Sequence, residues 1–275
     1  MAHRTFLDSL LAKAASFQAE RTTRKFIALL GRAIQHQSDL LTGLIRRGTG
    51  SRFGRDHGLD RIRSYGDFCG QIPIYSYADI SSYIEKVRAG DVGALLPRDE
   101  RVLMFALTSG TTAQPKYIPI TPTVLAECRR GWNIWGVKAI MDHPPSLLRH
   151  ILQVTSSMND HAAPSAVPCG AITGLLAATQ KRLVRKYYTS PAVVAGIKDP
   201  TAKYYTIMRL AIGRDVSWAV TANPSTLMLL AKTADEYKTQ LIRDVRDGTL
   251  WGDLPVSPAI RDALRPRLAA QPERA

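Results

Sequence analysis

Residues 102–116 decide the fold, and they read Val102-Leu103-Met104-Phe105-Ala106-Leu107, then Thr108-Ser109-Gly110-Thr111-Thr112-Ala113-Gln114-Pro115-Lys116. The first part is a continuous apolar run with charged residues just before it, which is typical of a buried strand. The second part is small, rich in hydroxyl groups and closed by proline and lysine. We therefore expect a buried strand that delivers a polar loop to the protein surface.

The loop Thr108–Lys116 carries the kinds of groups that hold a nucleotide triphosphate. Proteins bind such phosphates with backbone N–H groups, hydroxyls, a lysine and usually Mg²⁺. Gly110 lets the backbone approach a ligand closely, and Lys116 adds a point charge. Short hydroxyl side chains come from Ser109, Thr111 and Thr112. The loop is not the P-loop of many ATPases, because no Ser or Thr follows its lysine. The alternative interpretation is an exposed turn without a ligand.

Helices and strands alternate after the loop. Thr121 is a good N-cap and Pro122 suits the first helical position, which predicts a helix that runs to about Met141. Strands are predicted over residues 151–155 and 216–220, and helices over residues 203–212, 227–232 and 234–245. This alternation predicts an α/β fold, a mixed sheet with flanking helices.

The N-terminal residues have an all-helical pattern. Apolar residues recur at helical spacing up to Phe17 and again from Thr23, and Gly48 suits a helix stop. We expect two helices with a break between Phe17 and Thr23. The chain then divides into N-terminal helices at 1–50, a partial domain with the loop at 51–258, and a flexible tail at 259–275.

Composition excludes several classes of protein. The chain has 275 residues and three cysteines, which lie far apart and give neither a disulfide framework nor a metal clip. The histidines show no metal-binding spacing, and no apolar run is long enough to span a bilayer. We expect no metal site, no membrane partner and a cytoplasmic location. The net charge of +14 admits nucleic acid or anionic small molecules such as ATP. Because Lys and Arg are spread along the whole chain, we expect solvated helix faces and no specific nucleic-acid partner.

The loop resembles the phosphate-binding motif of the adenylate-forming superfamily, [ST]-S-G-[ST]-[ST]-G-x-P-K. Its continuation Tyr117-Ile118-Pro119-Ile120-Thr121 is similar to that of the Gretchen Hagen auxin-responsive promoter family of acyl acid amido synthetases. Further segments resemble that family in the same order along the chain: Arg55-Asp56-His57-Gly58-Leu59, Tyr77-Ala78-Asp79-Ile80, and Asp244-Val245-Arg246-Asp247-Gly248. The resemblance covers roughly residues 20 to 255 and implies an incomplete N-terminal domain of the adenylate-forming fold.

The resemblance also implies a function. Enzymes of this kind use ATP and Mg²⁺ to activate a carboxylic acid as an acyl adenylate and then join the acyl group to an amino acid as an amide. The implied roles are ATP phosphate binding by the loop and catalysis by Lys116. Ala113 departs from the motif, which usually has glycine there, and a positive φ at alanine would cost on the order of 1 kcal/mol. The residues that the resemblance implies for binding the ATP phosphates are Thr108, Ser109, Gly110, Thr111, Thr112 and Lys116.

The family's adenine-binding Tyr-Gly-x-[ST]-Glu segment has no counterpart here, since the Tyr65-Gly66 pair is followed by Asp67 and precedes the loop. We expect about half of a full-length member: a truncated product, one piece of a split enzyme that needs a second chain, or a non-catalytic relic that serves as a basic scaffold. The identities of the small carboxylic acid and the amino acid stay open.

Overall fold

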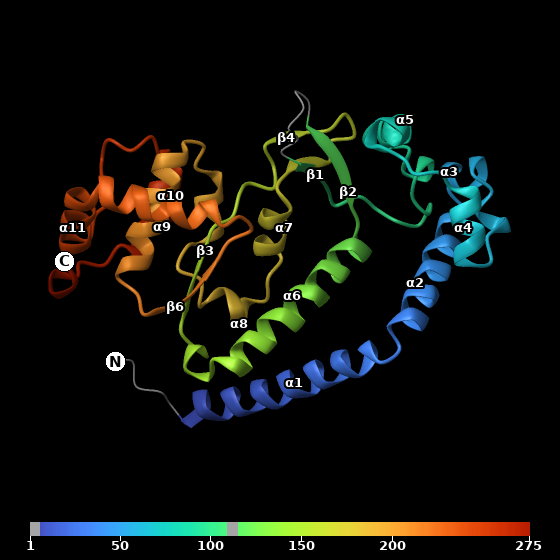
Figure 1. Ribbon diagram of the computed structural model, residues 1–275. Helices are drawn as coiled ribbons and strands as arrows, with labels where there is room; N and C mark the ends of the chain where they lie inside the picture. Colours follow the sequence, from blue (N-terminus) through green and yellow to red (C-terminus); the bar gives the residue numbers. More distant parts are fainter. Residues whose placement is uncertain (1–5, 109–114) are drawn as a thin grey trace. The chain divides into compact units, whose positions relative to one another are not determined.

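The structure is a computed structural model that describes residues 6–108 and 115–275. It forms two compact units (Figure 1). The first comprises the described residues up to His143 together with Met158–Gly170, and the second comprises Pro144–Ser157 and Ala171–Ala275. The predicted α/β class is confirmed, with a mixed sheet and flanking helices. The domain boundaries at residues 50 and 258 concern independent folding and stay a prediction.

The first unit begins with two long helices, α1 (Phe6–Leu30) and α2 (Ala33–Gly48). The all-helical N-terminus is confirmed, but the expected break between Phe17 and Thr23 is wrong. That segment contains neither glycine nor proline, whereas Gly31 lies in the break that the structure shows. Helix α1 runs beside α6 (Pro122–Asp142), where the Thr23 hydroxyl contacts the Met141 sulfur at 3.6 Å (Figure 1).

Short helices connect α2 to the sheet, and two of them begin with a capping box. In α4 (Tyr65–Gln71), the Asp67 N–H donates to the Ser64 hydroxyl while the Asp67 carboxylate accepts from the Ser64 N–H. In α5 (Tyr77–Arg88), the Asp79 carboxylate accepts from the Ser76 N–H at 2.7 Å. Both boxes satisfy backbone donors that the helix cannot bond itself. The other short elements are α3 (Arg52–Asp56) and the 3₁₀ turns Leu59–Arg61 and Val92–Ala94.

The sheet of the first unit has the strand order β2-β1-β5-β4. Strand β1 pairs with β2 antiparallel and with β5 parallel, and β4 pairs with β5 antiparallel, so the sheet is mixed. The predicted apolar strand is confirmed as β1, whose residues Met104 and Phe105 are fully buried. The strands are β1 (Met104–Thr108), β2 (Lys116–Ile120), β4 (His161–Ala162) and β5 (Pro168–Gly170).

Strand β2 was not predicted from the sequence, and Pro119 lies within it. Proline lacks an N–H and is tolerated in a sheet only at an edge, and β2 is an edge strand. The Tyr117 N–H donates to the Tyr77 hydroxyl at 2.9 Å and therefore faces away from β1. Residues two apart in a strand face the same side, so Pro119 also faces the free edge, where its missing N–H breaks no ladder bond.

Helix α5 packs on this sheet through Val87, which is buried against Phe105 of β1 and Cys169 of β5. A second, smaller cluster holds the end of α2 against the short helices, with Ile45, Leu59 and Ile62 at its centre. Burial of such side chains stabilises each by about 1.5–3 kcal/mol relative to exposure. The hairpin β1–β2 is thus fixed to α5 through a common apolar layer.

The second unit has a parallel pair of strands, β3 (His150–Gln153) and β6 (Val216–Val220), and Ile151 also bridges to Tyr188 in parallel. Both predicted strands are confirmed. The predicted helix over residues 234–245 is divided at Tyr237 between α10 and α11. The helices are α7 (Ile172–Ala178), α8 (Arg182–Arg185), α9 (Pro200–Ile212), α10 (Ser225–Glu236), α11 (Lys238–Asp247) and α12 (Pro258–Leu264); 3₁₀ turns cover Pro144–Ser146, Ala192–Gly196, Arg265–Arg267 and Pro272–Arg274.

The core of the second unit surrounds α9, whose Tyr205 is fully buried. The Tyr205 hydroxyl donates to the buried Asp244 carboxylate at 2.6 Å, and the same carboxylate accepts from the Thr249 hydroxyl at 2.6 Å and the Trp251 N–H at 2.7 Å. Burial, followed by the hydrogen bond to Asp244, raises the pKa of Tyr205. This network is fully paired, which suits a structural role and not catalysis.

The flexible tail expected at 259–275 is not what the structure shows. Residues 258–264 form α12, and Leu264 is fully buried in the core of the second unit. The Gln271 N–H donates to the Val245 carbonyl at 2.9 Å. The Arg261 guanidinium donates to several backbone carbonyls of the preceding turn. The arginine-rich composition predicted a solvated end, but the Arg261 guanidinium binds backbone carbonyls and Leu264 is buried in the core.

Candidate functional site

The hairpin of β1 and β2 brings the two ends of the predicted loop together. Thr108 is the last residue of β1, Lys116 is the first of β2, and the two form a pair in the antiparallel register. Both residues are exposed, whereas β1 is buried from Met104 to Ala106. The apolar run therefore anchors the hairpin, and the polar ends of the loop are accessible to a ligand.

Of the predicted site residues, the structure places Thr108 and Lys116 side by side. The remaining four, Ser109, Gly110, Thr111 and Thr112, lie outside the described residues, as do Ala113 and Gln114. Their role in phosphate binding stays a prediction.

Lys116 has an aromatic neighbour and, in the described part of the chain, no carboxylate partner. Its ammonium nitrogen lies 5.6 Å from the centroid of the Tyr77 ring. The ion pairs found among the described residues involve other cations. The charge of Lys116 is therefore available to an anion that enters at the open end of the hairpin.

Tyr117, the next residue of β2, is held from several sides. The Arg88 guanidinium stacks over its ring at 3.6 Å from the centroid, and Phe105 meets it edge to face with centroids 6.4 Å apart. Its hydroxyl lies 3.2 Å from His161 Nε2, and its N–H donates to Tyr77. The start of β2 is consequently fixed by both backbone and side-chain contacts.

The surroundings of Arg88 and Cys169, which lie beside Tyr117 and β1, shift the pKa values of both side chains. Burial opposes the charged form of Arg88, but hydrogen bonds to Glu85 at 2.6 and 2.7 Å and the Glu85 charge raise its pKa above the ordinary value. Arg88 therefore stays cationic. Burial raises the pKa of the Cys169 thiol, so this cysteine stays protonated and unsuited to nucleophilic catalysis.

Sequence reasoning identified the loop but missed its support, namely Tyr77, Arg88 and His161. Tyr77 and Arg88 open and close α5, and β4 brings His161 to the sheet, so only the fold places them near β2. The one available signal was Tyr77, which begins a segment with a family-like sequence. Nothing in the local pattern assigned it a contact with Lys116.

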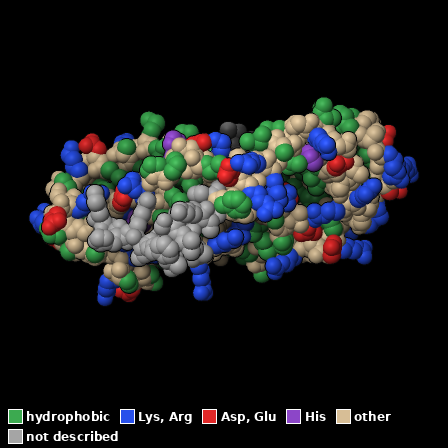
Figure 2. All heavy atoms as spheres, turned by 90° about the horizontal axis from the view of Figure 1, so that it is seen from below, with side chains coloured by type: hydrophobic (Ala, Val, Ile, Leu, Met, Phe, Trp, Pro, Cys, Tyr) green, Lys and Arg blue, Asp and Glu red, His purple; other side chains and the backbone are tan. Residues whose placement is uncertain are grey.

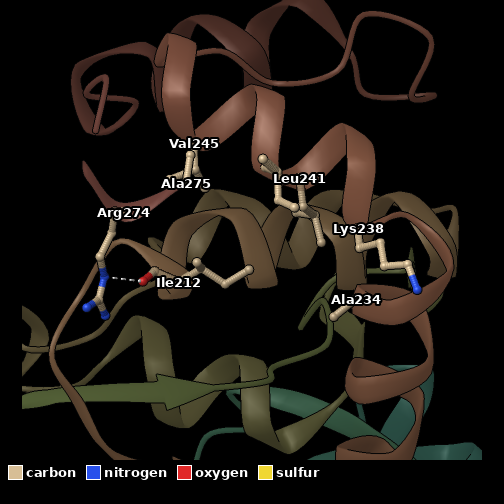
Figure 3. Close-up of a pocket in the computed structure, with 8 residues that line it drawn as sticks. Ile212, Ala234, Lys238, Leu241, Val245, Arg274 and Ala275 are labelled. Atoms are coloured by element: carbon tan, nitrogen blue, oxygen red, sulfur yellow. Dashed lines mark hydrogen bonds between the residues drawn. The ribbon is translucent and has the colours of Figure 1, made fainter. Parts of the chain in front are cut away.

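The second unit has a separate apolar pocket, which is too small for a nucleotide. Its volume is about 100 Å³, whereas ligand pockets typically measure about 300–1,000 Å³. Figure 3 shows Leu241 and Val245 above Ile212, whose carbonyl accepts a hydrogen bond from Arg274 at 3.3 Å. The lining offers no set of convergent polar groups, so we assign this pocket no chemistry.

The surface in view shows no separate basic patch, and the described helices include none that could span a membrane. Figure 2 shows Lys and Arg side chains interspersed with hydrophobic ones over the face that it presents. No helix in the described ranges has the length and apolar character needed to cross a membrane.

Comparison with known families identifies the family to which the chain belongs. The model of the GH3 family N-terminal domain matches residues 22–275, nearly the whole chain. The chain belongs to the GH3 family. The resemblance to the Gretchen Hagen amido synthetases predicted from the sequence is thereby confirmed.

Individual GH3 relatives agree with this assignment. The chain is 22% identical to a probable indole-3-acetic acid-amido synthetase GH3.12 of Oryza sativa subsp. japonica over 91% of this chain and 41% of the relative. It is 21% identical to the jasmonoyl-L-amino acid synthetase JAR4 of Nicotiana attenuata over 97% of this chain and 47% of the relative. The chain thus spans less than half the length of these GH3 proteins.

Solved GH3 structures share the fold. A GH3.15 acyl acid amido synthetase superposes with a TM-score of 0.73 at 14% identity, covering 100% of this chain and 46% of that one. The AtGH3.15 acyl acid amido synthetase in complex with 2,4-DB gives a TM-score of 0.75 at 16% identity over 92% of this chain and 45% of the other. The predicted fold is therefore confirmed as that of the N-terminal part of the GH3 proteins.

Proposed function

We propose that this chain supplies the phosphate-binding part of an enzyme that activates a carboxylic acid with ATP and then forms an amide with an amino acid. The observation that carries the proposal is the β1–β2 hairpin, which presents Thr108 beside Lys116 at the ends of the hydroxyl-rich loop. Lys116 has no carboxylate partner among the residues that the structure describes. Membership of a family whose relatives are named amido synthetases supports it.

The chemistry explains why such a loop is needed. A carboxylate is a poor electrophile, and attack of its oxygen on the α-phosphorus of ATP gives a mixed anhydride and releases pyrophosphate. The amine of the amino acid then attacks the acyl carbon and displaces AMP. In this proposal Lys116 is the catalytic residue that neutralises charge on the departing pyrophosphate. Binding of the ATP phosphates also involves the loop residues Thr108, Ser109, Gly110, Thr111 and Thr112.

Mg²⁺ fits the proposal only as a companion of ATP. Within the described ranges, no group of three or more His, Cys, Asp or Glu side chains is arranged to hold a metal ion. Mg²⁺ commonly keeps several waters and binds through substrate phosphates with few protein ligands. We therefore assign the loop hydroxyls and Lys116 to the phosphates and leave the ion to be carried by the nucleotide.

Because the chain spans less than half of its relatives, the proposal includes a second polypeptide segment that supplies the adenine site and completes amide formation. A cytoplasmic location would give it ATP and both substrates. The alternative is a non-catalytic relic that kept the fold as a basic scaffold.

The test is ATP–pyrophosphate exchange with a panel of carboxylic acids, together with calorimetric measurement of Mg-ATP binding to the purified chain. Lys116→Ala should lower exchange roughly a hundredfold or more, because a charge-stabilising group is lost. Lys86→Ala is the matched control, since Lys86 also lies 5.6 Å from a tyrosine ring, that of Tyr83, but is remote from the hairpin in sequence. An unchanged Mg-ATP affinity in Lys116→Ala would refute the phosphate role and leave the relic interpretation.

A further inference from the structure

Tyr77 contacts both residues that start β2. Its ring centroid lies 5.6 Å from the Lys116 ammonium, and its hydroxyl accepts the Tyr117 N–H at 2.9 Å. Tyr77 is the first residue of α5, and the capping box of Ser76 and Asp79 fixes that helix start. One side chain on a fixed helix terminus thus reaches the backbone and the cation of the hairpin.

The Tyr77 ring contacts a lysine side chain that has no ion pair with another described residue. Lysine has a flexible four-carbon stem and a strongly hydrated ammonium group, and Lys116 is exposed at the end of an edge strand. The face of an aromatic ring attracts an ammonium through its quadrupole without using the N–H donors in directed hydrogen bonds. The ring can therefore restrict where the charge lies while the donors stay available to phosphate oxygens.

The alternative role for Tyr77 is purely structural, through its hydroxyl. That hydroxyl satisfies a backbone donor on the free edge of β2, and this contact alone would explain a tyrosine here. The two roles separate chemically, because phenylalanine keeps the ring and loses the hydroxyl, whereas methionine keeps much of the bulk and loses both.

We propose that Tyr77 is a positioning residue, whose ring holds the Lys116 ammonium at the mouth of the β1–β2 hairpin in readiness for the phosphates of ATP. This inference rests on the proposed phosphate role of Lys116. A restrained lysine loses less conformational entropy when it binds, so the ring raises ATP affinity without touching the nucleotide.

The test combines a spectroscopic measurement without ligand and a binding measurement with Mg-ATP on the full chain. In the free protein, the ring current of Tyr77 should shift the Lys116 ε-methylene proton resonances upfield. The shift should persist in Tyr77→Phe and disappear in Tyr77→Met. By calorimetry, Tyr77→Met should weaken Mg-ATP binding about threefold to tenfold, and Tyr77→Phe should bind within about twofold of the wild type. Tyr83→Met is the matched control on the same helix, because the Tyr83 ring also has a lysine at 5.6 Å.

The possible results separate the two proposals. If Lys116→Ala binds Mg-ATP as the wild type does, the phosphate role fails, while the resonance shift still reports whether the ring and ammonium meet. If Lys116→Ala weakens binding and Tyr77→Met does not, the positioning role is wrong. Equal losses in Tyr77→Met and Tyr77→Phe would assign the effect to the hydroxyl, and an equal loss in Tyr83→Met would assign it to α5 in general; both overturn the inference.

Discussion

The carboxylate of Asp79 stabilises the first turn of α5, where Tyr77 lies. The Asp79 carboxylate accepts from both the N–H and the hydroxyl of Ser76, each at 2.7 Å. The hydroxyl hydrogen bond and then the backbone hydrogen bond lower the pKa of Asp79 below its ordinary value of 3.8. The ionised carboxylate is therefore the form that the folded helix prefers.

This preference predicts a dependence of α5 on pH. Because the folded-state pKa of Asp79 is lowered, its contribution is complete above the ordinary value and is lost as pH falls through the lower folded value. The Ser76 amide should lose hydrogen-exchange protection when the medium is acidified below about pH 4. Asp79→Asn should show weak protection at neutral pH and little further change in acid. Asp67→Asn, which disrupts the matching box of α4, should leave the Ser76 amide unaffected; a response at Ser76 would contradict this local origin.

Removal of the buried Asp244 charge should destabilise the second unit. Tyr205 and Trp251 donate to one oxygen of Asp244 and Thr249 donates to the other. Asparagine keeps a single oxygen, so Asp244→Asn sets an NH₂ group against the donor or donors at the other position. A buried donor without a partner costs about 1–3 kcal/mol, so the free energy of unfolding measured with urea should fall by about that much. Asp247→Asn, at an exposed ion pair with Arg246, should leave the transition unchanged. Equal unfolding midpoints for the two variants would rule out this account of the network.

At the scale of elements, the glycine that ends α11 allows the segment around Ala270 to pack closely against the helix end. Gly248 ends the helix with φ of 72°, in the left-handed region. A Cβ at this position would lie 2.7 Å from the Ala270 N and 3.0 Å from the Leu268 carbonyl oxygen. Glycine therefore permits both the helix stop and the close approach of the segment that follows α12.

Gly248→Ala should consequently destabilise the chain by more than about 1 kcal/mol, because backbone strain and a backbone clash act together. Thermal or chemical unfolding measures this change. Gly252→Ala is the matched control, since no atom lies within 4 Å of its Cβ position. If both alanine variants unfold alike, the close approach at Ala270 does not contribute to stability.

The elements that were predictable are those that depend on neighbours in sequence. The apolar run of β1 and the Thr121-Pro122 start of α6 are local signals, and the Thr121 hydroxyl accepts the Val124 N–H at 3.3 Å. Strand β2 was missed because its edge position makes Pro119 acceptable, and no local pattern shows which strand is an edge. The ordered C-terminal segment was missed for a similar reason, since Leu264 is buried by residues from α9 and the turns around it.

In the candidate site, too, the residues that are contiguous in sequence were predictable and those brought in by the fold were not. The sequence alone identified the loop because glycine, hydroxyls and lysine are contiguous in it. It did not identify Tyr77 or Arg88, which lie on α5 and reach β2 only through the packing of Val87 against Phe105 and Cys169.

At the scale of the whole molecule, the chain leaves many large apolar side chains exposed. Trp132 and Trp135 of α6 are 44% and 51% exposed, and on α2 Ile34 is 85% exposed. Large exposed apolar patches mark surfaces that contact proteins, membranes or ligands, or that favour aggregation. A segment equivalent to the remaining length of the GH3 relatives is the occupant that the proposed function requires.

Coexpression of this chain with a polypeptide that supplies that length should restore carboxylic-acid-dependent pyrophosphate exchange, and the two should elute together in size-exclusion chromatography. Trp132→Ser combined with Trp135→Ser should weaken the association, whereas Lys232→Ala on α10 of the second unit should not. Exchange that stays absent in a stable complex would favour the relic. A complex that forms equally well with the tryptophan variant would place the contact elsewhere.

The free edge of β2 has a consequence for how this chain behaves before any partner arrives. Of the two β2 residues whose backbone faces outward, Tyr117 gives its N–H to Tyr77 and Pro119 has none to give. A strand from another molecule that approached this edge would find no donor to start a ladder. This edge of the β1–β2 hairpin therefore offers few backbone donors to a foreign strand, which disfavours edge-to-edge association with a second molecule at β2.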